Sequence, residues 1–166
     1  LIESGVCSLK IEGRMKSPYY VATVVNAYRR ALDNYYSGEK DFAPPTLSNE
    51  LLKPSHRAYT TGFFYGRENE AKQYYESSKA DAESRFVASV LSWENGEALA
   101  EMRNRFRVGD VLEILSNGAS FGEKIIVESI TDSEGNNIDD CKIVQQKVKI
   151  PCPYPLSKYD ILRGAN

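Results

Sequence analysis

The spacing of apolar side chains changes in character along the chain. From Ser8 to Arg14, apolar and charged residues alternate, which is typical of a β-strand with one apolar and one charged face. Ser17 and Pro18 then provide an N-cap and a first-turn proline, so the sequence predicts a helix from Pro18 to about Tyr36. The apolar residues of this helix recur at helical spacing: Val21, Val24, Val25, Tyr28 and Leu32.

A connecting segment follows the predicted helix. The consecutive prolines Pro44 and Pro45 favour an extended backbone there. Beyond them we expect one or two helical turns from Leu47 to Leu52, and an ordered loop in the aromatic, glycine-punctuated block from His56 to Gly66. The polar segment from Glu68 to Ala82 has only a weak pattern, so we expect it to be exposed and variable in conformation.

Beyond Arg85, short runs of β-forming residues alternate with turn residues. Asn95-Gly96 and Asn117-Gly118 are hairpin-type dipeptides, because both residue types tolerate positive φ. Such spacing predicts an antiparallel barrel or sandwich. The predicted strands are Phe86–Leu91, Glu97–Met102, Asp110–Leu115, Lys124–Ile130, Lys142–Ile150 and Tyr159–Leu162.

Together these patterns place the chain in the α+β class, with three parts. Residues 1–42 would hold a strand and a helix, residues 43–84 a connecting segment, and residues 85–166 a small antiparallel barrel or sandwich. With 42% hydrophobic residues in 166, the chain has enough apolar surface for one compact core of ordinary size. Two full domains would not fit comfortably.

The charged face of the first predicted strand carries Lys10, Glu12 and Arg14. In a β/α barrel such a face lines the lumen beside the active site, whereas a solvated edge strand would show the same alternation. Arg14, Lys16 and the free N–H groups at the helix start could hold a phosphate or carboxylate, or could serve in ordinary capping. Without the rest of a barrel, the strand is expected to pair with another chain, refold or become disordered.

Charge and composition exclude several classes of function. The 21 basic and 23 acidic residues nearly cancel, so any basic site must be local. No apolar run reaches the roughly 20 residues that a membrane span needs, and the start lacks the order of a signal peptide, so we expect a soluble, cytoplasmic protein with no membrane partner. The sequence also lacks the GxSxG, HExxH and phosphate-loop patterns of common hydrolases and nucleotide enzymes.

The three cysteines, Cys7, Cys141 and Cys152, are far apart and lack the paired spacing of zinc or redox sites. We interpret them as structural thiols and predict no metal site. An iron–sulfur cluster needs about four thiolate ligands, so this chain cannot hold one alone. Because the sequence opens at Leu1 without an initiator Met, we expect the C-terminal portion of a larger enzyme, without a complete active site.

The only histidine, His56, lies beside Arg57 in the aromatic block. It has no visible acid, base or nucleophile partner, so it is a poor candidate for catalysis. His56, Arg57 and Tyr59 are instead candidates for substrate binding. The aromatic residues of this block could stack on bases or could seal two structural units together: Tyr59, Phe63, Phe64 and Tyr65.

The segment from Ser8 to Ala22 reads SLKIEGRMKSPYYVA and closely resembles the SLKIEGRMKS-x-x-YVA stretch of the collagenase-like peptidases, family U-32. The same order and spacing continue to about residue 66. Farther along, the family's C-terminal extension has an RNxF-x-x-GD-x-x-E-I pattern. Similar residues here are Arg103-Asn104-Arg105-Phe106, Val108-Gly109-Asp110 and Glu113-Ile114, and the end Asp160-Ile161-Leu162-Arg163 fits as well.

This resemblance implies an upstream barrel-like catalytic domain with a cysteine-rich signature, of which residues 1–42 would be the C-terminal strand and helix, truncated from the rest of the β/α barrel. It also implies that residues 85–166 are a C-terminal extension that resembles the small antiparallel β-barrel of translation factors. Cys7 stands where an acidic residue is usual, so no cysteine role is carried over. The family includes collagenase-type peptidases and proteins that hydroxylate a pyrimidine in transfer or ribosomal RNA, with prephenate-linked chemistry and an iron–sulfur cluster in the upstream domain. Four residues occupy matching motif positions and would support the upstream site: Lys10, Glu12, Arg14 and Lys16.

By itself the chain is therefore expected to be catalytically silent, with a barrel that seats tRNA, rRNA or a polypeptide for the upstream domain. Arg103, Arg105 and Arg107 would form a basic stripe if they continued the strand that ends near Met102. The barrel could instead be a protein-interaction or oligomerisation module. An autonomous protease is the weakest alternative, since no cysteine has an evident histidine partner. Nearby acidic residues could neutralise the stripe: Glu97, Glu101, Asp110 and Glu113.

Overall fold

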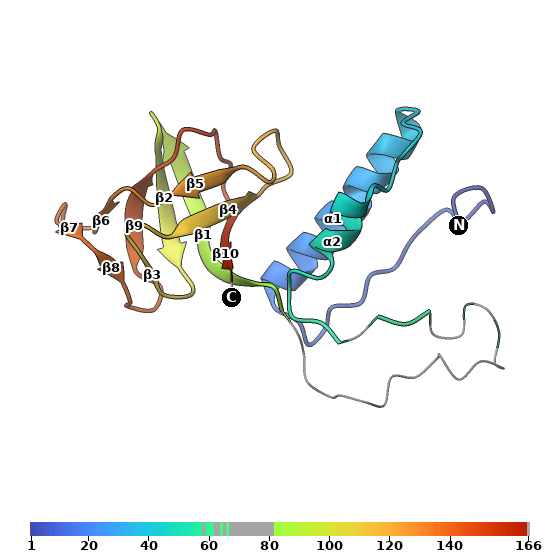
Figure 1. Ribbon diagram of the computed structural model, residues 1–166, viewed down its shortest axis with the longest axis horizontal. Coiled ribbons are helices and arrows are strands. Elements are labelled where there is room, and N and C mark those ends of the chain that lie inside the picture. The colour runs from blue at the N-terminus through green and yellow to red at the C-terminus, as the bar shows by residue number, and fades with distance from the viewer. Residues whose placement is uncertain (58, 62–63, 65, 67–81, 166) are drawn as a thin grey trace.

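The computed structural model describes residues 1–57, 59–61, 64, 66 and 82–165. A curved β-sheet formed by the distal half lies beside a pair of helices and an extended N-terminal segment (Figure 1). The helices are α1 (Pro18–Tyr36) and α2 (Pro45–Glu50). The strands are β1 (Ser84–Glu94), β2 (Glu97–Met102), β3 (Phe106–Arg107), β4 (Val111–Leu115), β5 (Lys124–Ile126), β6 (Ile130–Thr131), β7 (Asn137–Ile138), β8 (Asp140–Cys141), β9 (Lys147–Pro151) and β10 (Ile161–Ala165).

Helix α1 confirms the helix predicted from the sequence. The Ser17 side chain accepts a hydrogen bond from the Tyr20 N–H, and Pro18 occupies the first turn, where its missing N–H costs nothing. The helix ends at Ser37, and Gly38 adopts a φ of 84° that favours glycine. Helix α2 overlaps the helical turns predicted from Leu47 to Leu52, but it begins earlier, with Pro45 in its first turn and only Pro44 extended. It packs along α1 (Figure 1).

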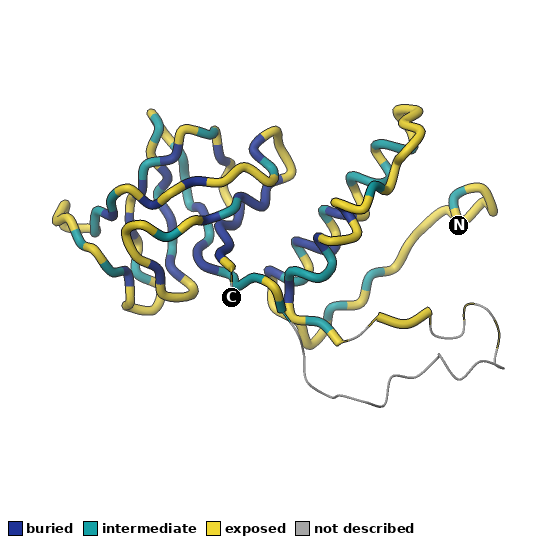
Figure 2. Tube along the Cα trace, viewed as in Figure 1, coloured by how far each residue is buried: buried dark blue, intermediate teal, exposed yellow. Residues whose placement is uncertain are grey.

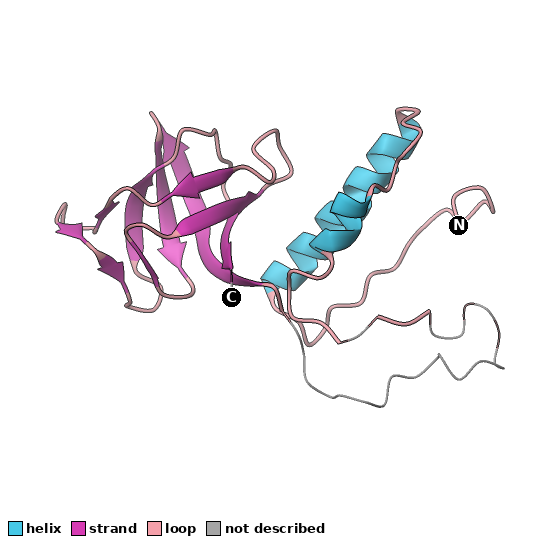
Figure 3. Cartoon of the chain, viewed as in Figure 1, coloured by secondary structure: helices cyan, strands magenta, loops and turns pink. Residues whose placement is uncertain are grey.

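The strand predicted from Ser8 to Arg14 is wrong. These residues form an irregular, mostly exposed segment, which is yellow in Figure 2 and drawn as loop in Figure 3. A strand needs a neighbour to pair its N–H and C=O groups, and the described part of the chain offers none here. Among the described residues, the expected β/α-barrel remnant is therefore represented by its helix alone, without a strand. Of the predicted exposed segment from Glu68 to Ala82, residues up to 81 lie outside the described residues.

The distal half forms a mostly antiparallel, curled sheet. Eight strands lie in the order β5-β4-β10-β1-β2-β9-β6-β7, and β3 pairs with β8 in a small second sheet. The register of β1 shifts between Phe86 and Ala88 and between Val90 and Ser92. Such bulges increase the local twist and bend the long strand, which lets the sheet curl around its core.

The predicted strands are only partly matched. The strand Glu97–Met102 is confirmed residue for residue as β2, whereas the predicted strand Lys124–Ile130 divides into β5 and β6. Residues 142–146 form a turn before β9, where Gln145 has a φ of 61°. The terminal strands β5 and β7 are not paired with each other in the described structure, so the sheet is an open half-barrel rather than the closed barrel expected.

Two apolar clusters organise the molecule. The larger one fills the inside of the curled sheet, with the fully buried residues Phe106, Leu112, Ile114, Ile150 and Leu162. The smaller one joins α1 to the sheet: Tyr19 stacks on Phe86 at a centroid distance of 5.9 Å, and its hydroxyl lies 2.8 Å from the Ser84 Oγ. No helix in the described part of the chain is long and apolar enough to cross a membrane.

Candidate functional site

The three arginines predicted to form a basic stripe do not share a strand face. Strand β2 ends at Met102 and β3 begins at Phe106, so the chain turns within the predicted stripe. Arg103 Nη2 lies 2.7 Å from Glu101 Oε1, and Arg105 forms a bidentate pair with Asp140. Arg107 Nε also lies 3.7 Å from Asp140. Hydrogen bonding from Arg105, together with nearby positive charge, lowers the pKa of Asp140. The three arginines therefore do not form one continuous stripe, and Glu101 and Asp140 compensate two of their three positive charges. Whether these arginines bind a substrate stays a prediction.

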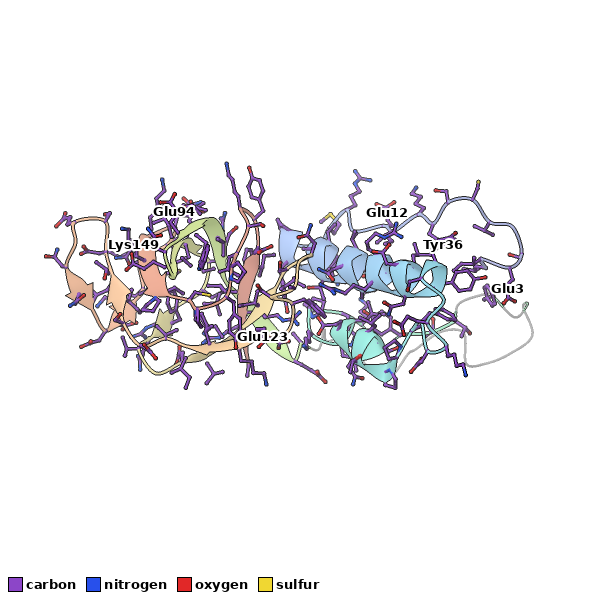
Figure 4. All side chains as sticks on the ribbon, turned by 90° about the horizontal axis from the view of Figure 1, so that it is seen from above. Glu3, Glu12, Tyr36, Glu94, Glu123 and Lys149 are labelled. Atoms are coloured by element: carbon purple, nitrogen blue, oxygen red, sulfur yellow. The ribbon has the colours of Figure 1, made fainter. Side chains whose placement is uncertain are left out.

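Three of the charged N-terminal candidates lie on exposed loop. Lys10 Nζ is 3.4 Å from Glu12 Oε2, and Arg14 is exposed. Figure 4 shows Glu12 beside α1, far from Glu94 and Lys149 at the other end of the molecule. Lys10, Glu12 and Arg14 do not converge on a common centre within the described residues. Whether they support a site elsewhere stays a prediction.

His56 and Tyr59 serve local packing. Their rings stack at a centroid distance of 4.9 Å, and the Tyr59 hydroxyl donates to the Leu51 carbonyl at 2.8 Å. Burial, with smaller effects of Tyr20 and Tyr28, raises the pKa of Tyr59. Arg57 is exposed. The base-stacking prediction for Phe63 and Tyr65 falls outside the described residues.

A groove of about 1000 Å³ lies between α1 and two loops of the sheet domain, residues 115–117 and 157–161. We call it the α1 groove. Its ionisable lining residues are Lys16, Arg29, Arg30, Lys158, Asp33 and Asp160. Because four are cationic and two are acidic, the lining carries a surplus of two positive charges.

The two acids of the α1 groove are already engaged. Asp33 pairs with Arg29 across one helical turn at 2.6 Å, and the buried Asp160 carboxylate accepts the Ser157 N–H at 2.8 Å. None of the other three cations has a carboxylate within ion-pair distance in the described structure. Lys16 donates instead to the Ser55 carbonyl at 2.8 Å. The groove thus has a surplus of two positive charges, whereas the three exposed arginines of the sheet share two carboxylates and keep a surplus of one.

Arg30 fixes α1 against the sheet domain. Its Nη2 donates to the carbonyls of Ser116 and Gly118, both at 3.1 Å, and Asn26 donates to the same Ser116 carbonyl at 2.7 Å. The guanidinium carbon lies 3.9 Å from the centroid of the Phe121 ring. Burial lowers the pKa of Arg30, against the opposing fields of nearby acids. Arg30 therefore holds two walls of the groove together.

A buried ionic cluster joins α2 to the sheet, and sequence reasoning missed it. The Arg163 side chain is fully buried, with Nη1 2.7 Å from Glu50 Oε2 and Nη2 2.8 Å from Glu113 Oε1. Lys53 Nζ bridges the same carboxylates at 2.6 and 2.8 Å. Burial alone would raise the pKa of Glu113, but hydrogen bonds from Lys53 and Arg163 outweigh it and leave the pKa lowered. Glu113 lies in the predicted strand Asp110–Leu115, but Arg163 lies just beyond the predicted strand Tyr159–Leu162, so the pairing of the two across β4 and β10 did not follow from the sequence.

The cysteines do not fit an iron–sulfur cluster. Cys141 and Cys152 are buried free thiols, and burial raises the pKa of Cys141 to about 11. Cys7 is exposed, so a structural role is not seen for it. No group of three or more His, Cys, Asp or Glu side chains suited to a metal ion occurs among the described residues. Because three thiols cannot supply about four ligands, any such cluster would need residues outside this chain.

Comparisons with known proteins identify the family. Residues 1–74 match the model of Peptidase family U32, and residues 82–163 match that of the Peptidase family U32 C-terminal domain. The chain belongs to peptidase family U32. This confirms the resemblance drawn from the SLKIEGRMKS segment and from the distal motifs.

The U32 relatives carry two kinds of name. A tRNA hydroxylation protein P1 of Bacillus subtilis is 35% identical, with 90% of this chain and 36% of that protein covered. A collagenase of Porphyromonas gingivalis is 25% identical, with 80% and 32% covered. The crystal structure of the C-terminal domain of a Geobacillus thermoleovorans U32 peptidase is 32% identical and covers 49% of this chain and 92% of that domain, with a TM-score of 0.45. This chain spans about a third of the length of the two named relatives.

Proposed function

We propose that this chain is the tRNA-seating part of a U32 protein that hydroxylates RNA, and that the α1 groove contacts the phosphate backbone. The observation that carries the proposal is the uncompensated positive charge of the groove, from Lys16, Arg30 and Lys158. The similarity supports RNA over polypeptide as the substrate, because the tRNA hydroxylation relative is 35% identical and the collagenase relative 25%.

The physical basis is the release of counterions from RNA. Each phosphate that a Lys or Arg neutralises releases condensed cations, so affinity falls as salt rises. Lys16, Arg29 and Lys158 all line the α1 groove and are exposed. We expect contacts with about two or three phosphates, which is enough for weak, salt-sensitive binding.

The chemistry itself is assigned to residues outside this chain. The carboxylates of Glu50 and Glu113 pair with Arg163 and Lys53, and burial raises the pKa of the Cys141 and Cys152 thiols. We propose that an upstream domain holds the catalytic groups and any iron–sulfur cluster. It would also cover the exposed apolar face of α1, where Val25 is 45%, Tyr28 44% and Tyr36 72% exposed. Alone, the 166-residue chain should neither hydroxylate RNA nor cleave peptides.

Binding of bulk tRNA to this chain across a salt series tests the proposal. A Lys16→Ala/Arg29→Ala/Lys158→Ala variant should lose at least about 10-fold in affinity at low salt and should show a shallower salt dependence. The control replaces Arg103, Arg105 and Arg107 by Ala. It removes the same number of charges and likewise leaves acids unpaired, so it should stay within about 3-fold of wild type.

Equal losses in both variants would mean that only net charge matters, and would contradict a role for the groove. Absence of binding by the wild-type chain at low salt would contradict the proposed function itself. Fluorescence anisotropy with labelled tRNA measures both quantities.

A second candidate function, a protein-interaction or oligomerisation module, is favoured by one observation. Val111 and Ile126 are paired across β4 and β5 and are 53% and 61% exposed, at an edge of the sheet. Exposed apolar pairs on an edge strand invite association. Sedimentation equilibrium tests this: a dimer that dissociates in a Val111→Thr/Ile126→Thr variant would favour this function, and a monomer would disfavour oligomerisation.

A further inference from the structure

The turn from Ser157 to Asp160 places an aromatic residue in an unusual backbone conformation. The Asp160 N–H donates to the Ser157 carbonyl at 3.0 Å, and the Asp160 carboxylate accepts the Ser157 N–H at 2.8 Å, so the turn is closed twice. Tyr159, its third residue, has a φ of 77° and donates its N–H to the Val90 carbonyl at 2.9 Å. Turns with positive φ at this position favour Gly or Asn, because a Cβ there is sterically costly.

Neither the turn nor the core explains a tyrosine at this position. Its side chain is 72% exposed, so the ring contributes little to the buried interior. The strain of positive φ is therefore not offset by burial. Strained residues that are not stabilised by packing cluster at binding sites, so the ring is a candidate for contact with a ligand.

The surroundings of the ring indicate the chemistry of that ligand. Tyr159 lines the α1 groove, and Lys158 Nζ lies 5.0 Å from the ring centroid. Lys16, which precedes α1, lines the same groove. An exposed aromatic ring among unpaired cations is the arrangement with which proteins bind single-stranded nucleic acid, since bases stack on the ring and phosphates meet the cations.

We propose, on the basis of the function proposed above, that Tyr159 stacks on an unpaired base of the RNA while Lys158 and Lys16 bind the flanking phosphates. The base must be unpaired and unstacked, because within a helix both of its faces are covered by neighbouring bases. The groove would thus select a loop or a splayed nucleotide over a duplex.

Substitutions at Tyr159 test the stacking role without disturbing the fold. Tyr159→Gly removes the ring and suits the positive φ, so its melting temperature should equal or exceed that of wild type. Tyr159→Phe keeps the ring and loses only the hydroxyl. The probes are a mixed-sequence single-stranded RNA and a fully paired RNA duplex of equal length, measured by fluorescence anisotropy.

The glycine variant should bind the single strand about 5- to 150-fold more weakly, while the phenylalanine variant stays within about 2-fold of wild type. Duplex binding should change by less than about 2-fold. The salt slope should also remain unchanged, since no charge is removed.

The contrary outcomes separate the two proposals. Wild-type-like binding of the single strand by the glycine variant, with salt-dependent binding intact, would overturn the stacking role alone. Equal losses for single strand and duplex would also overturn it. Absence of RNA binding by the wild-type chain would overturn both proposals. A lower melting temperature for the glycine variant would assign the ring a structural role or a protein contact instead.

Discussion

The exposed arginines of the sheet domain and the lining of the α1 groove both contain several basic residues. They differ in how many of these residues have a carboxylate nearby. Arg105 and Arg107 meet one carboxylate, that of Asp140, which cancels much of their field. In the α1 groove Asp33 pairs with Arg29 alone, and Asp160 accepts the Ser157 N–H. Lys158 has no carboxylate within ion-pair distance among the described residues. The comparison teaches that the charge a ligand meets depends on where the fold places acidic side chains, and less on the spacing of basic ones.

The largest expected effect is on stability, and it comes from the buried ionic cluster of Arg163, Glu50, Glu113 and Lys53, which joins α2 to the sheet (the buried joint). Arg163→Met should lower the free energy of unfolding by about 3–5 kcal/mol, because the buried Glu50 and the half-buried Glu113 lose their pairing with Arg163 and keep only Lys53. It should also loosen the helix wall and so weaken tRNA binding by the groove. The exposed Arg105→Met serves as control and should change stability little. Urea denaturation decides, and equal midpoints for the two variants would contradict the role of the joint.

The sequence predicted the elements whose signals are local. Ser17 and Pro18 fix the start of α1. The apolar residues of this helix recur at helical spacing, a signal that lies within the segment itself. Strand β2 was predicted residue for residue because Asn95-Gly96 marks the turn before it. Both depend on residues close in sequence, for which backbone preference and burial agree.

The failures depend on contacts between distant residues. Residues 8–14 alternate like a strand but have no neighbouring strand among the described residues, and the arginine alternation breaks because β2 ends at Met102. Glu50 meets Arg163 across a separation of 113 residues, which no local pattern encodes. Tyr159 was missed because a bulky residue rarely adopts positive φ.

The next largest effect on stability and tRNA affinity is expected from a substitution that alters the geometry of the α1 groove without changing its charge. Arg30→Lys keeps the positive charge but loses the planar group that bonds the Ser116 and Gly118 carbonyls. We expect a loss of about 1 kcal/mol in the free energy of unfolding, together with a roughly 2- to 3-fold loss in tRNA affinity. Arg29→Lys, on the neighbouring exposed position, is the control. If both variants match wild type, Arg30 does not hold the groove walls together.

A smaller effect is expected from a substitution that should make the region of Arg105 and Arg107 bind tRNA. Asp140→Asn removes the carboxylate that neutralises Arg105 and Arg107, with almost no change in shape. We expect tRNA affinity at low salt to rise about 2- to 5-fold and its salt dependence to steepen. Asp139→Asn makes the same change in net charge at the adjacent exposed residue. Anisotropy titrations should show a smaller gain for this control, and equal gains would attribute the effect to net charge.

The smallest expected effect is a change in the pH dependence of stability. It should be seen for Glu113 in the buried joint and not for an exposed carboxylate. The pKa of Glu113 in the folded chain lies below its ordinary value of 4.5, because Lys53 and Arg163 outweigh the effect of burial. A lowered folded pKa means that the carboxylate stabilises the fold fully above about pH 4.5, and that this contribution is lost as the pH falls through the folded pKa. Glu113→Gln should therefore be less stable than wild type at neutral pH, with a difference that shrinks below pH 4.5. Glu94→Gln, on an exposed residue at the end of β1, should show no such convergence in urea melts across this range. A constant difference for Glu113→Gln would mean that hydrogen bonding, rather than the charge of Glu113, supports the joint.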